Sequence, residues 1–155
     1  MYQRSLFPDE EQSQKTLILL SLQPQYWHLI LSGAKKYEYR RLFREDAVQA
    51  YIYLSSPRKE IVGFIDFDSP LIRPPAEIAT LAESQSPGSR QRILDYFGDR
   101  TQAFAIPILS YELFKPISLS ELRERFNFTA PQSYLVLDKH PDMRKFIQLR
   151  HRGRE

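Results

Sequence analysis

The sequence predicts one domain of the α+β class, with strands and helices packed around a single core. The chain has 155 residues, of which 42% are hydrophobic and 13% aromatic, which is enough to bury the core of one compact domain. Strand-like and helix-like segments follow one another without an internal repeat or a change of composition that would mark a second domain. We therefore expect one sheet with helices packed beside it.

The chain is expected to begin its fold with a strand and a short helix. Residues 16–22 form an apolar run of strand length, and Pro24 suits the first turn of a helix that ends near residue 32. Gly33 is expected to end this helix in the left-handed conformation. A lone tryptophan on a short helix, Trp27, is expected to serve packing more than ligand stacking. The residues that recur at helical spacing and are expected to pack on the sheet are Tyr26, Leu29 and Ile30.

After Gly33, charged and aromatic residues alternate where a buried strand would carry aliphatic ones. If residues 36–41 are extended, the alternation sends the two kinds of side chain to opposite faces. One face carries Lys36, Glu38 and Arg40, and the other carries Tyr37, Tyr39 and Arg41. A carboxylate between two cations stays ionised and orients its neighbours, so this row could bind a base edge or a phosphate inside a cleft. An edge strand protected by charge against aggregation is the alternative.

Two further strands are expected over residues 50–54 and 61–67, joined by a turn that is rich in hydrogen-bond donors. The turn contains two hydroxyls, two cations and a proline-fixed bend. Its polar residues are Ser55, Ser56, Arg58 and Lys59. Such a turn could hold a phosphate, although an ordinary solvated hairpin loop has the same residue types.

Two helices and a long strand are expected in the middle of the chain. The helices lie over residues 76–83 and 90–97, each with a proline or a breaker before it. The strand covers residues 102–113, and Pro107 suggests an edge position or a bulge partway along it.

The last third of the sequence predicts a helix with an N-terminal cap, then a strand and a terminal helix. Ser118 and Glu121 form a capping box for a helix over residues 119–126. A strand over residues 133–137 then precedes Pro141, which starts the terminal helix.

The charge is concentrated at the carboxyl end. The chain has a net charge of +3, but residues 139–155 alone carry +4 and the other 138 residues carry −1. The basic residues after Lys139 are Arg144, Lys145, Arg150, Arg152 and Arg154. We expect three parts, namely a loose polar leader over residues 1–15, a domain over residues 16–138, and a basic helix and tail. The tail could supply sequence-independent phosphate contacts, or it is a solvated helix end where arginines favour the dipole.

Several classes of site are excluded or disfavoured by composition. The chain has no cysteine, so it has no disulfide, thiol nucleophile or thiolate metal site. His28, His140 and His151 lack the spacing of metal ligands, and neither a glycine-rich phosphate loop nor a nucleophile elbow is found. We therefore expect no metal and no cofactor. No apolar run reaches the about 18 residues of a membrane span, and no signal peptide is recognisable, so we expect a cytoplasmic protein with no membrane partner.

Ordered short motifs resemble the ASCH family, which is named for activating signal cointegrator homology. Residues 20–24 precede a helix ending at Gly33, and Lys35, Glu38 and Arg40 follow in the order G-x-K-x-x-E-x-R. Further motifs of this kind occupy residues 51–57 with 61–64, 95–98 before 103–106, 115–119 and 131–134. The resemblance covers about residues 17–137. It implies a PUA-like fold, which is a small curved β-barrel or sheet with flanking helices.

The resemblance also implies a ligand, because PUA-like domains usually read RNA or modified bases. The expected partner is single-stranded RNA or a modified nucleoside, bound in a cleft lined by the charged row and the 55–59 turn. Single-stranded bases are held by rings and cations together. The cations and acid are Lys35, Lys36, Glu38 and Arg40, and the expected stacking rings are Tyr37, Tyr39 and Tyr53.

Two other classes of function remain open. Some ASCH proteins are amidohydrolases that deacetylate N4-acetylcytidine with a lysine and a threonine, and others look like ribonucleases acting on single strands. Lys35 stands at the position of that lysine, but Glu38 stands where the threonine would be, so the hydroxyl nucleophile is missing. A metal-independent hydrolase would use Lys35 and Glu38 as catalytic residues. A transcription coregulator that contacts only proteins is the other class.

Overall fold

The computed structural model describes residues 15–153, which form a curved sheet with flanking helices. The strands are β1 (Thr16–Leu22), β2 (Tyr37–Arg40), β3 (Val48–Leu54), β4 (Glu60–Phe67), β5 (Leu71–Arg73), β6 (Ala103–Ser118) and β7 (Tyr134–Val136). The helices are α2 (Pro24–Leu31), α3 (Pro75–Gln85), α4 (Arg90–Phe97), α5 (Leu119–Phe126), the short η2 (Leu137–Lys139) and α6 (Pro141–His151). The predicted α+β class with a curved sheet is confirmed.

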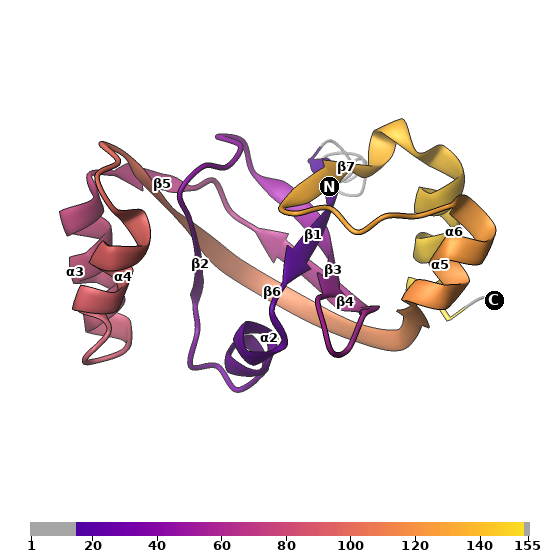
Figure 1. The fold of residues 1–155 in the computed structure, drawn as a ribbon, viewed down its shortest axis with the longest axis horizontal. Helices are drawn as coiled ribbons and strands as arrows, with labels where there is room; N and C mark the ends of the chain where they lie inside the picture. The colour runs from indigo at the N-terminus through magenta and orange to yellow at the C-terminus, as the bar shows by residue number, and fades with distance from the viewer. Residues whose placement is uncertain (1–14, 154–155) are drawn as a thin grey trace, which may run out of the picture.

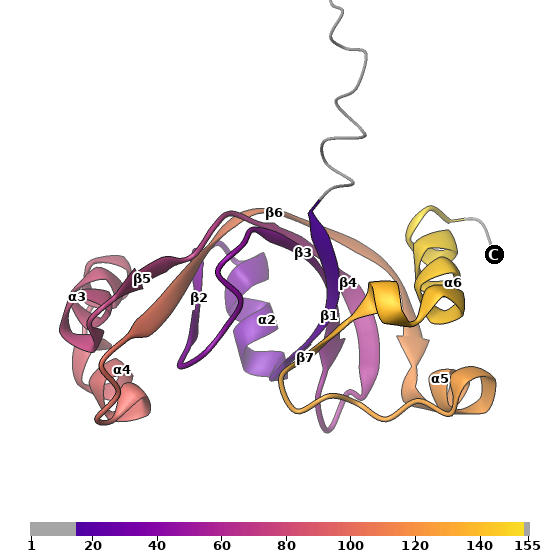
Figure 2. The same ribbon diagram turned by 90° about the horizontal axis from the view of Figure 1, so that it is seen from above.

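The sheet bends into an arch (Figures 1 and 2). Its strand order is β2-β6-β4-β3-β1-β7, and β5 pairs with β6 beside this path. β1 runs parallel to β3, whereas the other pairs are antiparallel. Figure 2 shows α2 under the arch, the α3–α4 hairpin at one end and α5 with α6 at the other. The sheet is therefore covered by helices on its inner face and at both ends.

Helix α2 fills the inner side of the arch. Trp27 and Ile30 are its buried residues, with Trp27 only 2% exposed, so the expected packing role of Trp27 is confirmed. Leu29 was expected to pack on the sheet, but it is 44% exposed because it lies on the outer side of the helix. A Cβ atom at Gly63 would come within 2.9 Å of the Trp27 ring and 2.5 Å of the Glu112 carbonyl oxygen. Only glycine allows β4 to lie this close to α2.

Helices α5 and α6 cover the opposite face of β1 and β3. Leu19 and Tyr51 of these strands pack with Leu122 of α5 and Ile147 of α6 in one buried cluster. Because β1 is buried on both faces, its sequence is a continuous apolar run and does not alternate. The Ser118 hydroxyl accepts a hydrogen bond from the Glu121 amide at 3.1 Å, as the predicted N-cap requires.

Strand β6 is longer than predicted. It runs from the α3–α4 hairpin over α2 to the start of α5 (Figure 2). It continues to Ser118, five residues beyond the expected end. Its pairing with β4 shifts register at one point: Asp66 of β4 pairs with Ser110 of β6, but the next residue, Phe67, pairs with Ile108. The irregularity directly follows Pro107, so the expected bulge is confirmed.

Arg150 takes a different place from the one expected for the basic tail. It is 6% exposed, and its guanidinium donates to the Pro116 carbonyl oxygen at 2.8 Å and lies 3.3 Å from a Glu121 carboxylate oxygen. The side chain therefore joins α6 to β6 and α5 and is not available to a phosphate on the surface. None of the described helices is long and apolar enough to cross a membrane. The leader residues 1–14 and Arg154 lie outside the described residues.

The curvature of the sheet brings its two ends together. β2 stands at one end of the strand order and β1 and β7 at the other. Phe43, which follows β2, packs edge-on against Tyr134 of β7 with ring centroids 5.3 Å apart. The Arg40 guanidinium of β2 donates to the Ser21 carbonyl oxygen of β1 at 3.0 Å. A cleft opens where these ends meet α2 and α4.

Candidate functional site

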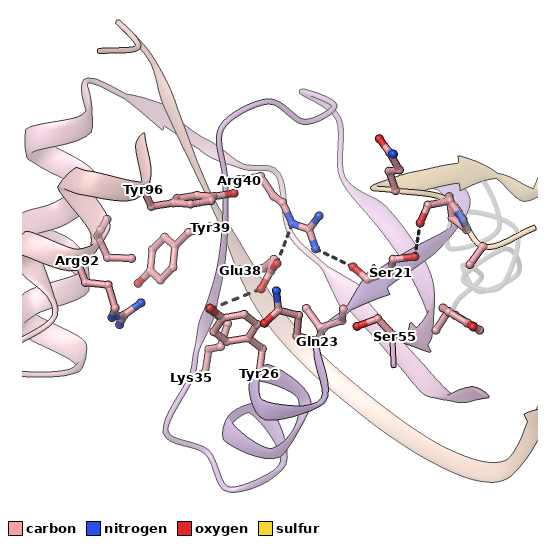
Figure 3. A pocket seen from close by; sticks show the side chains of 16 residues that line it. Ser21, Gln23, Tyr26, Lys35, Glu38, Tyr39, Arg40, Ser55, Arg92 and Tyr96 are labelled. Atoms are coloured by element: carbon pink, nitrogen blue, oxygen red, sulfur yellow. Dashed lines mark hydrogen bonds and ion pairs between the residues drawn. The ribbon is translucent and has the colours of Figure 1, made fainter. Parts of the chain in front are cut away.

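The cleft has a volume of about 610 Å³. Its walls come from α2, β2, the end of β3, α4 and the segment before β7. Figure 3 shows Tyr39, Arg92 and Tyr96 gathered beside α4, and Lys35, Glu38 and Tyr26 beside α2. Its walls thus combine aromatic rings, cations and one acid.

Glu38 forms the ionic centre of the cleft and is only 5% exposed. Arg40 Nε donates to Glu38 Oε2 at 2.7 Å, and Lys35 Nζ lies 3.5 Å from Glu38 Oε1. Arg40 is also held by the Ser21 carbonyl oxygen. Both carboxylate oxygens are therefore engaged by cations, which makes Glu38 suited to orient them.

Lys35 is held between the acid and two tyrosine rings. Its backbone amide donates to the Leu29 carbonyl oxygen at 3.1 Å, which fixes the chain after α2. Its Nζ lies 4.7 Å from the ring centroid of Tyr39 and 5.3 Å from that of Tyr26. Burial lowers the pKa of Lys35 below its ordinary value of 10.5, although the charge of Glu38 acts in the opposite direction. The neutral amine is therefore more populated than in an exposed lysine at the same pH.

Two tyrosines of the cleft, Tyr39 and Tyr53, hold their protons more tightly than exposed tyrosines do, because burial raises the pKa of each. Burial raises the pKa of Tyr39 to about 12. Tyr26 and Tyr96 complete the set of tyrosines that line the cleft. These side chains offer ring faces for stacking and hydroxyl groups that can donate hydrogen bonds.

The structure brings together about half of the residues expected at the site. The predicted residues that line the cleft are Lys35, Glu38, Tyr39, Arg40, Tyr53 and Ser55. The predicted residues outside its lining are Lys36, Tyr37, Ser56, Arg58 and Lys59.

Lys36 and Tyr37 lie outside the lining because of their positions at the start of β2. β2 begins at Tyr37, so Lys36 lies before the strand and is exposed, and it does not continue the row of Glu38 and Arg40. Tyr37 stacks on Tyr39 at 6.3 Å between ring centroids and packs towards α3 and α4.

Only the first residue of the 55–59 turn, Ser55, lines the cleft. The Ser55 amide donates to the Leu22 carbonyl oxygen at 3.0 Å, which places Ser55 in the lining. Ser56, Arg58 and Lys59 follow it and are exposed. Arg58 Nε donates to Glu60 at 2.6 Å, so its guanidinium already has an acidic neighbour on its own hairpin.

The basic residues of α6 lie away from the cleft. Arg144 pairs with Asp138 at 2.7 Å, Arg150 is buried, and Lys145 and Arg152 are exposed. None of these four lines the cleft.

Sequence reasoning missed several residues that complete the cleft. They are Ser21, Gln23, Tyr26, Arg92, Tyr96 and Gln132. Arg92 and Tyr96 are four residues apart on the exposed side of α4, next to buried Ile93 and Phe97. That spacing shows a shared helix face, but nothing local shows that the face borders a strand more than 50 residues earlier.

Residues 15–153 contain no group of three or more histidine, aspartate or glutamate side chains placed to hold a metal ion.

The lowered pKa of Lys35 predicts a pH dependence of stability. The unfolded chain binds the Lys35 proton more tightly than the folded chain, so the free energy of unfolding should rise with pH from the folded pKa up to about 10.5. The slope is at most about 1.4 kcal/mol per pH unit for one proton. Urea unfolding from pH 7 to 10 should show this rise in the wild type but not in Lys35→Met. Lys36→Met, which removes an exposed neighbour, should retain it; equal slopes in all three proteins would contradict the assignment.

No family model matches the chain, whereas individual relatives do. An ASCH domain-containing ribonuclease of Zymomonas mobilis is 30% identical over 134 residues, covering 84% of this chain and 90% of the relative. The crystal structure of ASCH from Zymomonas mobilis superposes with a TM-score of 0.72 at 28% identity, covering 86% of this chain and 95% of that one.

A protein of Rhodopseudomonas palustris, at 13% identity, shares the fold with a TM-score of 0.52, covering 86% of this chain and 94% of that one. The match to the Zymomonas relative extends over most of both chains. The chain therefore belongs to the ASCH family and has a PUA-like fold.

Proposed function

We propose that this protein binds single-stranded RNA in the cleft and cleaves it. The observation that carries the proposal is the row of half-buried Lys35, buried Glu38 and half-buried Arg40, which lines an open cleft between tyrosine rings. The Zymomonas relative is named a ribonuclease, and this name supports RNA as the ligand. A volume of about 610 Å³ lies in the range of clefts that enclose a small ligand, which favours an extended strand over a duplex.

The cleft offers the two kinds of contact on which single-strand binding depends. Bases can stack on the rings of Tyr26, Tyr39 and Tyr96, because every base has a π-face. Phosphates can approach Lys35, Arg40 and Arg92, which all line the same cleft.

Glu38 is best suited to orient its neighbours. A general base needs an oxygen within hydrogen-bond reach of the proton that it accepts, whereas each Glu38 oxygen already faces a nitrogen donor, Arg40 Nε at 2.7 Å and Lys35 Nζ at 3.5 Å. The Lys35 nitrogen keeps N–H donors in its neutral form. With Glu38 in place, Arg40 is fixed between it and the Ser21 carbonyl oxygen. The same arrangement disfavours deacetylation of N4-acetylcytidine, because a doubly paired carboxylate occupies the position of the threonine.

Lys35 is the proposed proton acceptor for cleavage. Its neutral amine would take the proton of a ribose 2′-hydroxyl, whose oxygen then attacks the adjacent phosphorus. The new 2′-O–P bond forms as the P–O5′ bond breaks, and the departing oxygen takes a proton from a donor such as the hydroxyl of Tyr39 or Tyr53. The Arg40 guanidinium would stabilise the charge that develops on the phosphate oxygens.

The stacking role of the cleft gives a prediction for RNA affinity. Tyr96→Ala should weaken binding of a single-stranded RNA by at least about fivefold, since stacking on one ring contributes about 1–3 kcal/mol. Tyr111→Ala is the matched control, because Tyr111 lies outside the cleft and is 39% exposed against 38% for Tyr96. Fluorescence anisotropy at about 50 mM salt measures both. A wild type that binds no RNA there would support the protein-interaction class and end the RNA proposal.

The role of Lys35 gives a prediction for cleavage. Lys35→Met should lower the cleavage rate by about two to four orders of magnitude, while Lys36→Met should leave it near the wild-type rate. The wild-type rate should rise with pH up to the lowered pKa of Lys35, because the acceptor must be neutral. Denaturing gels of labelled RNA, with magnesium present so that a metal requirement does not hide activity, measure the rates. Equal rates in the two variants, or cleavage of a 2′-deoxy strand, would contradict the proposed step.

A further inference from the structure

A second depression lies beside the end of α5 and the start of α6. Its volume is about 600 Å³, and we name it the distal depression. Its floor is apolar and is formed by Phe126, Phe128, Leu135 and Met143. Its rim is polar and includes Arg125, Asn127, Thr129 and His140, which are exposed. An apolar floor with a polar rim suits a ligand that has both a flat ring and polar groups.

The distal depression adjoins the cleft along one short segment of chain. Residues 127–129 line the depression, and residues 130–132 line the cleft. Phe128 of the depression packs on Tyr53 of the cleft with ring centroids 5.8 Å apart. Figure 2 shows this segment running from α5 across the open side of the sheet to β7. The two cavities are therefore neighbours that share an aromatic wall.

The groups around the depression match a nucleotide better than an isolated anion. Phe126 is half-buried, so part of its ring can receive a base. Arg125 and His140 supply donors at the rim, and α6 starts there without a side-chain cap on its first turn. The carboxylate of Asp142 also lines the depression and opposes a free phosphate. A phosphodiester carries one negative charge, so Asp142 opposes it less than the higher charge of a free phosphate, and its base can lie on the apolar floor while its oxygens meet Arg125 and His140.

We propose that the distal depression is a second nucleotide subsite, occupied by a nucleotide of the same RNA strand that enters the cleft. This inference rests on the proposed function. It extends the RNA site across the 127–132 segment and predicts that affinity depends on strand length. The cleft holds one part of the strand, and the distal depression holds a flanking nucleotide through stacking on Phe126 and polar contacts from Arg125 and His140.

Binding of RNA strands of two lengths tests the second subsite. Anisotropy titrations compare a labelled dinucleotide with a labelled hexanucleotide of the same sequence type. The variants are Phe126→Leu, which keeps an apolar floor but removes the ring, and the double change Arg125→Gln with His140→Gln. The matched control is Arg100→Gln with His28→Gln, which removes the same residue types from exposed positions that line neither cavity. Circular dichroism checks that each variant is folded.

The expected result is a loss confined to the longer strand. Each distal variant should bind the hexanucleotide at least about fivefold more weakly and the dinucleotide as the wild type does, while the control binds both normally. Equal losses on both lengths, or none on the hexanucleotide, would overturn the second subsite and leave the cleft proposal standing. A wild type that binds neither strand would overturn the proposed function, so the two failures are distinguishable.

Discussion

The ion pair of buried Glu38 and half-buried Arg40 connects the two ends of the curved sheet, and the shape of the cleft depends on it. Arg40 lies on β2, and its guanidinium reaches both Glu38 and the Ser21 carbonyl oxygen of β1, at the far side of the strand order. A buried carboxylate is tolerated only when its oxygens are paired, and removal of one partner leaves an uncompensated charge. The groups that hold the arch closed are thus the groups that would meet a phosphate.

The charges of this protein divide into two kinds. In the cleft, Glu38 is buried and Lys35 and Arg40 are half-buried. Burial lowers the pKa of Lys35, and the Glu38 carboxylate holds the Arg40 guanidinium in one direction. The charges of the carboxyl-terminal helix serve several purposes, since Arg150 joins α6 to β6, Arg144 pairs with Asp138, and Lys145 is exposed. A net positive charge therefore does not locate the binding site. The local arrangement of a few cations and rings does so more directly.

The sequence predicts the elements and the ionic row because both depend on short-range patterns. Pro24 and Gly33 mark helix ends through their backbone conformations, and Ser118 marks one through its side-chain hydroxyl. The order of Lys35, Glu38 and Arg40 marks a polar strand. The presence of Arg92 and Tyr96 in the lining of the cleft could not be predicted, because it depends on how the α3–α4 hairpin packs against β2 in three dimensions. The burial of Arg150 was missed for the same reason, since its partners Pro116 and Glu121 are about 30 residues away.

Photochemical cross-linking tests the central claim most directly, namely that RNA occupies the cleft. A single-stranded RNA that contains 4-thiouridine is irradiated with the wild-type protein, and the linked residues are identified by mass spectrometry. If RNA lies in the cleft, cross-links should form at Tyr26, Tyr39 or Tyr96, whose rings line it. Cross-links confined to the exposed side of α6, near Lys145 and Arg152, would contradict it, because they would place the RNA on the basic helix instead.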